Sequence, residues 1–471
     1  MRKTKIIATL GPACDSESAI RDLALAGMNV ARINLSHGDQ KDIIDRITKV
    51  KKVSRETELP IAVMLDTRGP EIRLQKFEND SVEVSENEKF ILRNSQILGD
   101  NTQASVSFDG FYKSLKTGDL LLMCDGLVKM VVEKIEGTDI CLNIMCGGTL
   151  SNNKSINAPG VKLDMPYLND ADKSDLLVGI ANDIDFVASS FVSKKQDVED
   201  IKAFLRENGG ADIDVVAKIE SVQGIENLSE ILPISDGIMV ARGDLGVEFP
   251  YEKLPPLQKE LVKRTREMGK RVIVATEMLE SMIKNPRPTR AETSDVANAV
   301  YDGASAIMLS GETAAGKYPK LAVKTMAAIA EYTESCIHYK KRFAVQDFKI
   351  KNIADCISNS AVKASFDLEC SAILVVTESG ASARMVSRFR PTCPIIAITP
   401  NVKTYYKLAM SWGVVPVLGT NQTSSEELFR HATTISKQKG LIAVGQKVIT
   451  VSSTSVGQVG LTNLMKLDLV L

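Results

Sequence analysis

Three ionisable side chains that follow short apolar runs have the types and spacing needed for phosphoryl transfer. The segments AKIE (217–220) and ARGD (241–244) place Lys218, Glu220 and Asp244 at the ends of two such runs. Side chains at i and i+2 of an extended segment share a face, so Lys218 and Glu220 are expected to point together. Glu220 and Asp244 form a pair suited to Mg²⁺ or Mn²⁺, because Mg²⁺ prefers one or two carboxylates and takes its other ligands from water and substrate phosphate. Lys218 would neutralise charge on the phosphoryl group in transit.

Two other interpretations of Lys218 stay open at this point. It could form a plain surface ion pair with Glu220, or a Schiff base with a carbonyl substrate, as the lysines of barrel aldolases do. The adjacent carboxylate pair argues against the Schiff base, since amines that attack carbonyls rarely need a divalent ion. The 8 cysteines form no CxxC pair and only 3 histidines occur, so we expect any metal to have oxygen ligands.

The elements that position these residues are short β-branched runs separated by helical patterns. The runs occupy 6–10, 30–34, 62–66, 186–190, 215–219, 237–241, 272–275 and 306–309. Alternation of strand and helix over eight units is typical of a closed parallel (β/α)8 TIM barrel, and an open doubly wound sheet is the competing interpretation for any five or six of them. Polar residues gather at the ends of these runs, where the active sites of barrels lie.

Two further domains accompany the predicted barrel. Its third and fourth strands lie about 120 residues apart, far beyond an ordinary crossover, which predicts an inserted domain over 69–165. Alternating segments at 89–93, 120–124, 128–135 and 140–145, broken by Asp-Gly and Gly-Gly, favour a small antiparallel β-barrel placed as a lid over the mouth. The barrel would then comprise 1–68 and 166–345, and an open α/β domain would follow over 346–471, with an edge strand at 464–471.

Composition excludes several classes of function. There are 58 Lys+Arg against 59 Asp+Glu, a net charge of −1, which argues against a coat for nucleic acid or for an anionic membrane. No apolar run approaches the roughly 18–20 residues of a membrane span, and the apolar run after the basic N-terminus is too short for a signal peptide. We therefore expect a cytoplasmic protein. No Walker A motif occurs, so a nucleotide would be held in another way.

Seven segments carry a more specific pattern. They are MNVARINLSHG (28–38), MLDTRGPEIR (64–73), VVAKIESVQGIEN (215–227), VARGDLGVE (240–248), VATEMLESM (274–282), RPTRAE (287–292) and MLSGETAAGKYP (308–319). Together and in this order they resemble the pyruvate kinase family, in the bacterial type without an additional C-terminal extension domain. The resemblance implies the same three-domain architecture. It also implies transfer of a phosphoryl group from phosphoenolpyruvate to ADP, giving pyruvate and ATP in the last step of glycolysis.

The resemblance assigns roles at the mouth of the barrel. Arg32 would bind the phosphate of phosphoenolpyruvate, Lys218 would stabilise the transferring group, and Glu220 and Asp244 would ligate Mg²⁺ or Mn²⁺. The remaining substrate contacts would come from the backbone of Ala241, Arg242 and Gly243, from Asp244, and from the Thr276 hydroxyl. Ser310 and Glu312 resemble members of a water-relayed proton path.

Ion and nucleotide sites follow from the same resemblance. Asn34, Ser36, Asp66 and Thr67 match the potassium site, and Glu71 matches the potassium-requiring type, in which a bound cation supplies the charge that a lysine supplies elsewhere. Arg73, Lys154, Asn34 and His37 match positions that face ADP or ATP, and Asp125 matches a lid residue that closes toward the site. Arg68 and Glu277 depart from the usual Lys and Gln of their segments, which affects nucleotide affinity and the hinge more than the reaction.

The C-terminal domain carries a possible effector site. Thr377, Ser379, Gly380, Ala381 and Ser382 lie between a strand and a helix, and their hydroxyls and N–H groups either cradle a phosphate or simply cap the helix. The resemblance favours a phosphorylated-sugar or nucleotide-monophosphate effector and a homotetramer. Two alternatives to the kinase stay open: a metal-dependent lyase or aldolase of the phosphoenolpyruvate type on the same barrel, and a non-catalytic metabolite-sensing scaffold.

Overall fold

A computed structural model describes residues 1–124, 126–453 and 462–471 of the chain. Its centre is a closed barrel of eight parallel strands, in the order β1-β17-β16-β15-β14-β13-β3-β2. The strands are β1 (Lys5–Thr9), β2 (Val30–Asn34), β3 (Ala62–Asp66), β13 (Phe186–Ser189), β14 (Asp214–Ile219), β15 (Gly237–Ala241), β16 (Arg271–Ala275) and β17 (Ala306–Leu309). The predicted barrel is therefore confirmed, and no predicted strand boundary differs by more than one residue.

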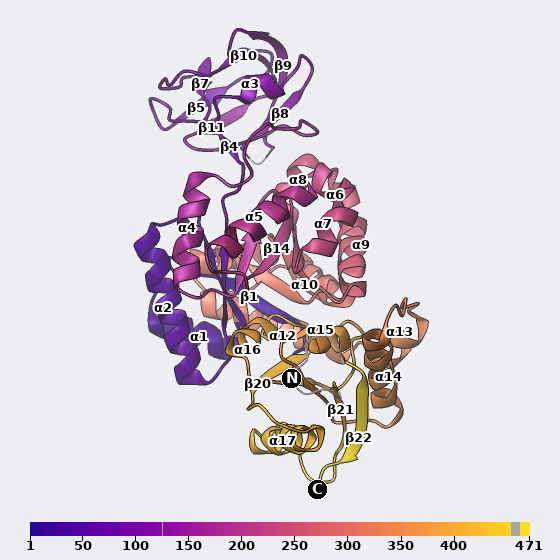
Figure 1. Ribbon diagram of the computed structural model, residues 1–471. Helices are drawn as coiled ribbons and strands as arrows, with labels where there is room; N and C mark the ends of the chain where they lie inside the picture. Colours follow the sequence, from indigo (N-terminus) through magenta and orange to yellow (C-terminus); the bar gives the residue numbers. More distant parts are fainter. Residues whose placement is uncertain (125, 454–461) are drawn as a thin grey trace.

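Helices cover the outside of the barrel (Figure 1). They are α1 (Glu17–Ala26), α2 (Gln40–Thr57), α4 (Asp170–Ala181), α5 (Lys195–Glu207), α6 (Val222–Glu226), α7 (Leu228–Ile234), α8 (Arg242–Glu248), α9 (Leu254–Glu267), α10 (Arg290–Asp302), α11 (Gly311–Ala314) and α12 (Pro319–Ser335), with 3₁₀ turns at Tyr251–Lys253 and Glu280–Ile283. The helix α13 (Tyr339–Val345) lies beside the C-terminal domain, where Phe343 packs on Phe366 and Phe389. Capping boxes fix where two of them begin, with Asp39 and Asp42 at α2 and Thr289 and Glu292 at α10.

The interior of the barrel is packed with apolar side chains, so the fold has a solid core below its mouth. Alternate strand residues such as Met64, Phe186 and Met239 form one cluster, all of them fully buried. Ala409 and Met410 of the C-terminal domain belong to the same cluster. The C-terminal domain therefore closes the end of the barrel opposite the lid, and chemistry is confined to the mouth.

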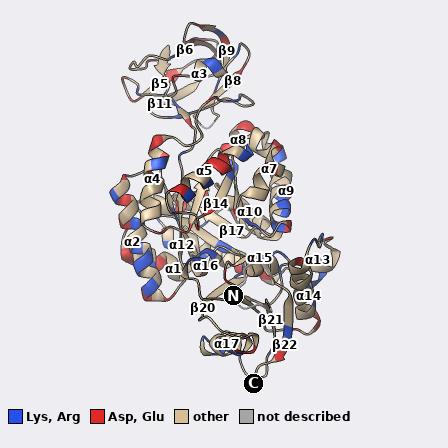
Figure 2. Ribbon diagram, viewed as in Figure 1, with Lys and Arg blue, Asp and Glu red and all other residues tan. Residues whose placement is uncertain are grey.

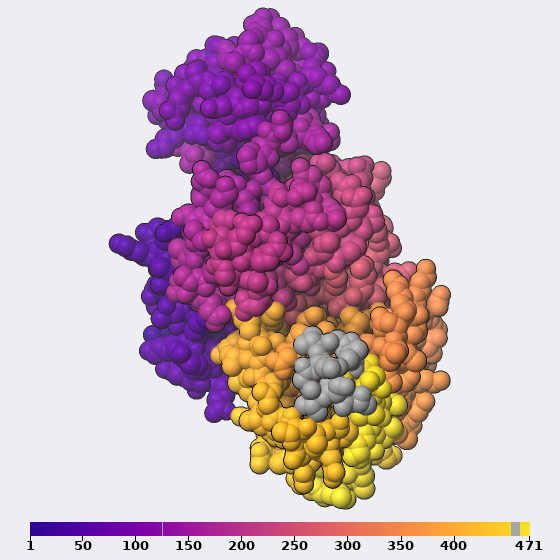
Figure 3. All heavy atoms as spheres, viewed as in Figure 1, coloured from indigo at the N-terminus to yellow at the C-terminus, as the bar shows by residue number. Residues whose placement is uncertain are grey.

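The inserted segment forms a lobe of its own above the mouth (Figures 1 and 3). Its curled seven-stranded sheet has the order β4-β12-β8-β9-β10-β6-β7, beside a two-stranded sheet of β11 and β5. The elements are β4 (Ile72–Arg73), β5 (Ser81–Val84), β6 (Lys89–Arg93), β7 (Gln103–Ser105), α3 (Phe111–Ser114), β8 (Leu120–Met123), β9 (Val128–Glu136), β10 (Asp139–Cys146), β11 (Gly148–Ser151) and β12 (Ser155–Asn157). An antiparallel lid was expected, but β6 and β7 pair in parallel.

The C-terminal domain is the expected open α/β sheet, in the order β20-β19-β18-β21-β22. Its elements are α14 (Ile353–Asp367), β18 (Ala372–Val376), α15 (Ala381–Ser387), β19 (Ile395–Thr399), α16 (Val402–Leu408), β20 (Val414–Leu418), α17 (Ser425–Gln438), β21 (Lys447–Ser452) and β22 (Leu464–Leu469). The last strand pairs antiparallel with β21 at the edge, as the alternating C-terminus predicts. The helix α15 begins directly after Gly380, which adopts a left-handed φ of 77° as its N-cap.

Charges of both signs are interspersed along the outer helices (Figure 2). This distribution agrees with the net charge of −1. Within the described part of the chain, no helix is both long enough and apolar enough to cross a bilayer.

Candidate active site

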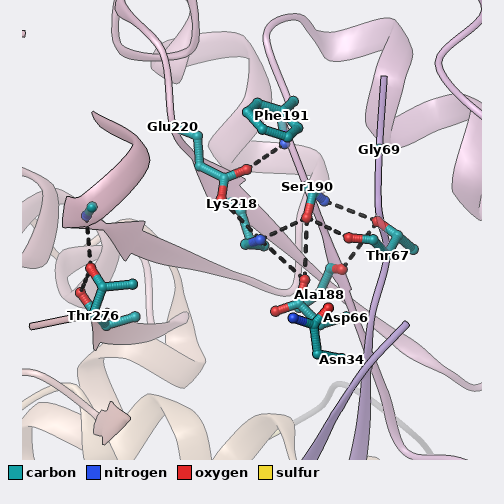
Figure 4. Close-up of polar contacts among 12 residues, drawn as sticks. Asn34, Asp66, Thr67, Gly69, Ala188, Ser190, Phe191, Lys218, Glu220 and Thr276 are labelled. Atoms are coloured by element: carbon teal, nitrogen blue, oxygen red, sulfur yellow. Dashed lines mark hydrogen bonds and ion pairs between the residues drawn. The ribbon is translucent and has the colours of Figure 1, made fainter. Parts of the chain in front are cut away.

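The Lys218 ammonium lies at the mouth of the barrel, surrounded by oxygen atoms (Figure 4). Its Nζ is 2.9 Å from Glu220 Oε1 and 3.1 Å from Asp66 Oδ1, and it donates a 2.6 Å hydrogen bond to Ser190 Oγ. Lys218 and Glu220 lie on β14 and just after it, Asp66 ends β3, and Ser190 follows β13. The expectation that Lys218 and Glu220 point together is confirmed, and neither lies on the surface, because all four side chains are buried.

The electrostatics of this cluster favour an additional cation. Burial opposes the charge on Asp66, but the Arg32 and Lys218 cations outweigh it and hold the pKa of Asp66 below its usual value. Burial raises the pKa of Glu220 to about 8; Lys218 opposes this shift and Asp244 reinforces it. Glu220 Oε2 accepts the Phe191 N–H at 2.6 Å, whereas the partner of the buried Oε1 is the Lys218 ammonium, 2.9 Å away. A carboxylate oxygen in this condition is suited to a metal ion.

Arg32, in the middle of β2, is held in place from two sides. Its Nε donates to Asp66 Oδ2 at 2.6 Å and its Nη1 donates to Thr9 Oγ1 at 2.9 Å. Thr9 in turn donates its hydroxyl proton to the carbonyl oxygen of Leu309 at 2.8 Å. Thr9 was not among the predicted site residues, although its place near the end of the first run, before Gly11, was a signal. Asp66 therefore joins Arg32 and Lys218, the two cations expected to contact phosphate.

The residues expected to hold potassium lie on neighbouring strand ends. Asn34 pairs with Asp66 in the β2–β3 register, and Thr67 follows directly. Asn34 Oδ1 accepts the Ser36 N–H at 3.1 Å, so the loop after β2 folds back toward this edge. Among the described residues no group of three or more His, Cys, Asp or Glu is placed to hold a metal ion. The two expected ion sites supply at most two carboxylates each, with amide, hydroxyl and carbonyl oxygens beside them.

The start of α8 meets the end of β16. The Gly243 N–H donates to Thr276 Oγ1 at 2.8 Å, so two groups expected to contact substrate contact each other. Arg242 spans the same junction, since its Nη2 donates to the Thr276 carbonyl at 2.6 Å and its Nη1 to Asp295 at 2.7 Å. Thr276 and Glu277 both have positive φ, 67° and 53°, a strained pair of the kind that persists where the surroundings fix it. Ala241 is buried at the end of β15, with Arg242, Gly243 and Asp244 half-buried after it.

Ser310 and Glu312 follow β17. The Glu312 carboxylate accepts the N–H groups of Ser310 at 2.7 Å and Leu279 at 3.0 Å, and it is buried. These contacts tie the loop after β17 to the loop after β16, on which Thr276 lies. Glu312 therefore orders this side of the mouth, and Ser310 lies half-buried beside it.

The lid contributes Arg73 and Lys154 from its base. Arg73 forms an ion pair with Glu71 at 2.6 Å and donates to the Asn153 carbonyl at 2.7 Å, so it lies next to the exposed Lys154. A cavity of about 420 Å³ separates the lid base from the barrel, and it is lined by Glu71 and Phe191 among others. His37 is exposed on the loop after β2, and Asp125 lies outside the described residues.

The turn expected to bind an effector connects β18 with α15, in the domain at the far end of the barrel from the lid (Figure 1). The Thr377 hydroxyl accepts the Gly380 N–H at 3.0 Å, and Ser382 forms a hydroxyl–hydroxyl hydrogen bond with Thr462 at 2.5 Å. Ser379 and Ala381 lie half-buried on the same turn. The Thr377 hydroxyl therefore stabilises the turn before the helix, whereas the Ser382 hydroxyl bonds outside the turn, to Thr462.

Comparison with known proteins covers the whole chain. The family model described as pyruvate kinase, barrel domain, matches residues 1–323, and the one described as pyruvate kinase, alpha/beta domain, matches 355–467. The chain is 44% identical over 472 residues to the pyruvate kinase of Clostridium acetobutylicum, covering 100% of both chains. It is 43% identical to that of Bacillus licheniformis, of which it covers 81%.

A solved structure agrees with these sequence relatives. The pyruvate kinase of Cryptosporidium parvum superposes with a TM-score of 0.93 at 34% identity, covering 100% of this chain and 96% of that one. The matches support the kinase interpretation and neither of the two alternatives, the lyase and the sensing scaffold. By its sequence and its fold, from the barrel through the lid to the C-terminal sheet, this chain belongs to the pyruvate kinase family of transferases.

Proposed function

We propose that the residues at the barrel mouth carry out the family's reaction, the transfer of a phosphoryl group from phosphoenolpyruvate to ADP. One observation carries the assignment: the buried Lys218 ammonium is shared by Asp66 and Glu220, and Asp66 also binds Arg32. Two fixed cations next to one carboxylate form a preorganised site for a phosphoryl group, whose charge is spread over several oxygens. Preorganisation matters because the groups need not move as charge develops.

A divalent ion fits beside these cations. Glu220 and Asp244 would hold Mg²⁺ or Mn²⁺, supported by the burial of the Glu220 carboxylate and by the effect of Asp244, which raises the pKa of Glu220. Such an ion supplies charge neutralisation at substrate oxygens. The chain's own part is to fix the Glu220 carboxylate, which the Phe191 N–H does at 2.6 Å, and to exclude water from it by burial.

The remaining roles are assigned to the same mouth. Arg32 would orient the phosphate, and the backbone of Ala241, Arg242 and Gly243, with the Thr276 hydroxyl, would orient the carboxylate of the substrate. The Gly243–Thr276 hydrogen bond supports this, because both groups already converge on one place. Ser310 would take part in moving the proton that enolpyruvate gains, with Glu312 holding its backbone. Potassium would be held by Asn34, Ser36, Asp66 and Thr67, and ADP by Arg73, Lys154, Asn34 and His37.

The test is a coupled assay of pyruvate formation. The purified chain is incubated with phosphoenolpyruvate, Mg²⁺ and K⁺, with and without ADP, and pyruvate and ATP are measured separately. The proposal expects equal amounts of both products, formed only when ADP is present. Pyruvate formed without ADP would indicate a hydrolase or lyase on the same barrel, and no product under any condition would leave a non-catalytic sensor.

We further propose that the chain is a cytoplasmic homotetramer under allosteric control. The effector would be a phosphorylated sugar or a nucleotide monophosphate bound at Thr377, Ser379, Gly380, Ala381 and Ser382, supported by the place of these residues on the turn between β18 and α15. The domain limits at 69–165 and 346–471 remain part of the same proposal, and all strands of the lid sheets fall inside the first.

A further inference from the structure

Ser190 lies at the centre of the cluster and bonds to three of its members (Figure 4). Its Oγ accepts from Lys218 Nζ at 2.6 Å and lies 2.6 Å from the Thr67 carbonyl oxygen and 3.2 Å from Asp66 Oδ1. A serine hydroxyl has one proton to donate. The shorter contact directs that proton to Thr67, while Asp66 receives the Lys218 ammonium directly at 3.1 Å.

The backbone of Ser190 bonds to the same neighbour. Its N–H donates to Thr67 Oγ1 at 3.1 Å, so Ser190 and Thr67 are joined by both side chain and main chain. The Ser190 carbonyl accepts the Tyr167 hydroxyl at 2.8 Å. These contacts are all buried, which strengthens them and makes the loss of any one partner costly.

The next residue serves the other side of the cluster. Phe191 has a φ of 54°, a left-handed conformation that non-glycine residues rarely adopt and that persists where surroundings fix it. This turn aims the Phe191 N–H at Glu220 Oε2. Gly69 packs against the turn so closely that a Cβ would lie 2.9 Å from the Ser190 carbonyl oxygen. The Ser190–Phe191 turn therefore contacts Lys218 through one residue and Glu220 through the other.

We propose that Ser190 is a positioning residue for the reaction: its hydroxyl holds the Lys218 ammonium beside the Asp66–Thr67 segment and so couples Lys218 to the segment that would hold potassium. Without the hydroxyl, Lys218 keeps only its two carboxylates and the Thr67 carbonyl loses its donor. The ammonium then shifts toward Glu220, away from the phosphoryl group. The inference rests on the proposed function for its kinetic consequence, but the position of Lys218 can be measured without it.

The experiment compares Ser190→Ala with Ser235→Ala. Ser235 is an equally buried serine of the same barrel, whose hydroxyl bonds only within its own helix, to the Ile231 carbonyl at 2.8 Å. Hydrogen bonds to charged groups are the strong ones, so we expect Ser190→Ala to lower kcat by about ten- to hundredfold, with the KM of phosphoenolpyruvate and of ADP changed less than about threefold. Ser190→Thr, which keeps the hydroxyl, should recover most of the loss, and Ser235→Ala should leave kcat unchanged.

Two readouts do not depend on turnover. The concentration of KCl that gives half the maximal thermal stabilisation, relative to tetramethylammonium chloride at equal ionic strength, should rise at least about threefold in Ser190→Ala only. A crystal structure of the variant should show Lys218 Nζ displaced from Asp66 toward Glu220. If Ser190→Ala does not fold, Ser190→Cys replaces it, because a thiol of similar volume is a weak donor and acceptor and should shift every readout the same way.

The outcomes separate the two proposals. A wild-type chain that makes no pyruvate refutes the proposed function, while the crystal structure and the KCl titration still decide the role of Ser190. The role is overturned if Lys218 Nζ keeps its place in the variant and kcat stays within about twofold of wild type. It is also overturned if Ser235→Ala lowers kcat as much, since the loss would then follow from any buried cavity.

Discussion

Replacing Lys218 by methionine tests the electrostatic cluster directly. Methionine keeps the length and apolar stem of lysine but removes the ammonium, and the side chain is only 11% exposed. Two unit charges about 3 Å apart interact by roughly 5 kcal/mol at the effective dielectric constant of 20 that suits protein sites. If half a unit of charge develops on the transferring group, the lost stabilisation is about 2.5 kcal/mol, which is at least fiftyfold in rate. We therefore expect kcat to fall by about fifty- to hundredfold.

The fold should survive this change. Asp66 keeps Arg32 at 2.6 Å, and Glu220 keeps the Phe191 N–H and becomes neutral more readily. The assay is pyruvate formation under saturating substrates, with thermal unfolding as the check on structure. Lys202→Met is the matched control, because Lys202 forms a half-exposed ion pair with Asp236 at 2.7 Å on the outside of the barrel. A folded Lys218→Met variant within tenfold of wild-type kcat would refute the assignment.

Three further predictions concern ions and pH. Turnover should fall at least tenfold when tetramethylammonium replaces potassium in sodium-free buffer, and Glu71→Lys should remove this dependence; unchanged wild-type turnover would contradict the potassium site. Glu220→Gln should abolish turnover and the thermal stabilisation by MgCl₂. It should not lower the thermal midpoint in the absence of Mg²⁺, because the substitution removes a charge that burial penalises. If MgCl₂ still raised the thermal midpoint of the variant, the ion would bind elsewhere. Burial raises the pKa of Asp185 to about 7, above its unfolded value of about 3.8, so the native state binds the extra proton and stability should fall as pH rises from about 4 to 7. Asp185→Asn, which can still accept the Val63 N–H, should flatten that part of the profile of thermal midpoint against pH, and an identical slope in the variant would assign the titration to another group.

Periodicity was sufficient to predict the barrel because its strands read as buried β-branched runs. Three of the five one-residue errors have a common cause at the lower end of the barrel, where Lys5, Asp214 and Arg271 begin strands. Lys5 Nζ donates to the Val414 carbonyl at 2.7 Å, and Arg271 binds Asp214 at 2.7 Å and the Lys407 carbonyl at 3.0 Å. Lys5 and Arg271 thus donate to backbone carbonyls of the C-terminal domain that closes the barrel, and Asp214 is paired with Arg271 beneath it. A local pattern cannot show that a charged residue is buried by a domain far away in the chain.

The lid departs from the expected pattern for a different reason. Gln103–Ser105 is only three residues long, too short for alternation to reveal it, and it pairs in parallel with Lys89–Arg93. Parallel pairing needs a connection that crosses over, and here the connection is the irregular segment between the two strands. Hairpin signals such as Asp-Gly identify antiparallel neighbours and carry no information on such a pair.

The candidate site likewise contains residues that the sequence could predict and residues that it could not. Lys218, Glu220 and Asp66 end strands of a parallel barrel, so their meeting follows from topology alone. Thr9 acts through a hydroxyl that accepts a hydrogen bond from Arg32 on the neighbouring strand, and Phe191 acts through its backbone N–H, which donates to Glu220. The type of neither residue indicates such a role in the sequence. Ser190 was visible only as one polar strand end among several. Residues that position others are found by their contacts, and contacts between strands require the register.

The charges at the mouth explain why substrate and ion should bind together. Four carboxylates, those of Asp66, Glu71, Glu220 and Asp244, share the region with three cationic side chains, those of Arg32, Arg73 and Lys218. Among the described residues Asp244 has no ion-pair partner, so the excess of negative charge lies near Glu220 and Asp244. Arg32 and Lys218 lie on the opposite side, where both form ion pairs with Asp66. An anion bound by Arg32 and Lys218 adds negative charge beside Glu220, and this charge raises the affinity of the Glu220–Asp244 pair for a divalent cation. Because coupling between two ligands is reciprocal, the cation raises the affinity for the anion by the same factor.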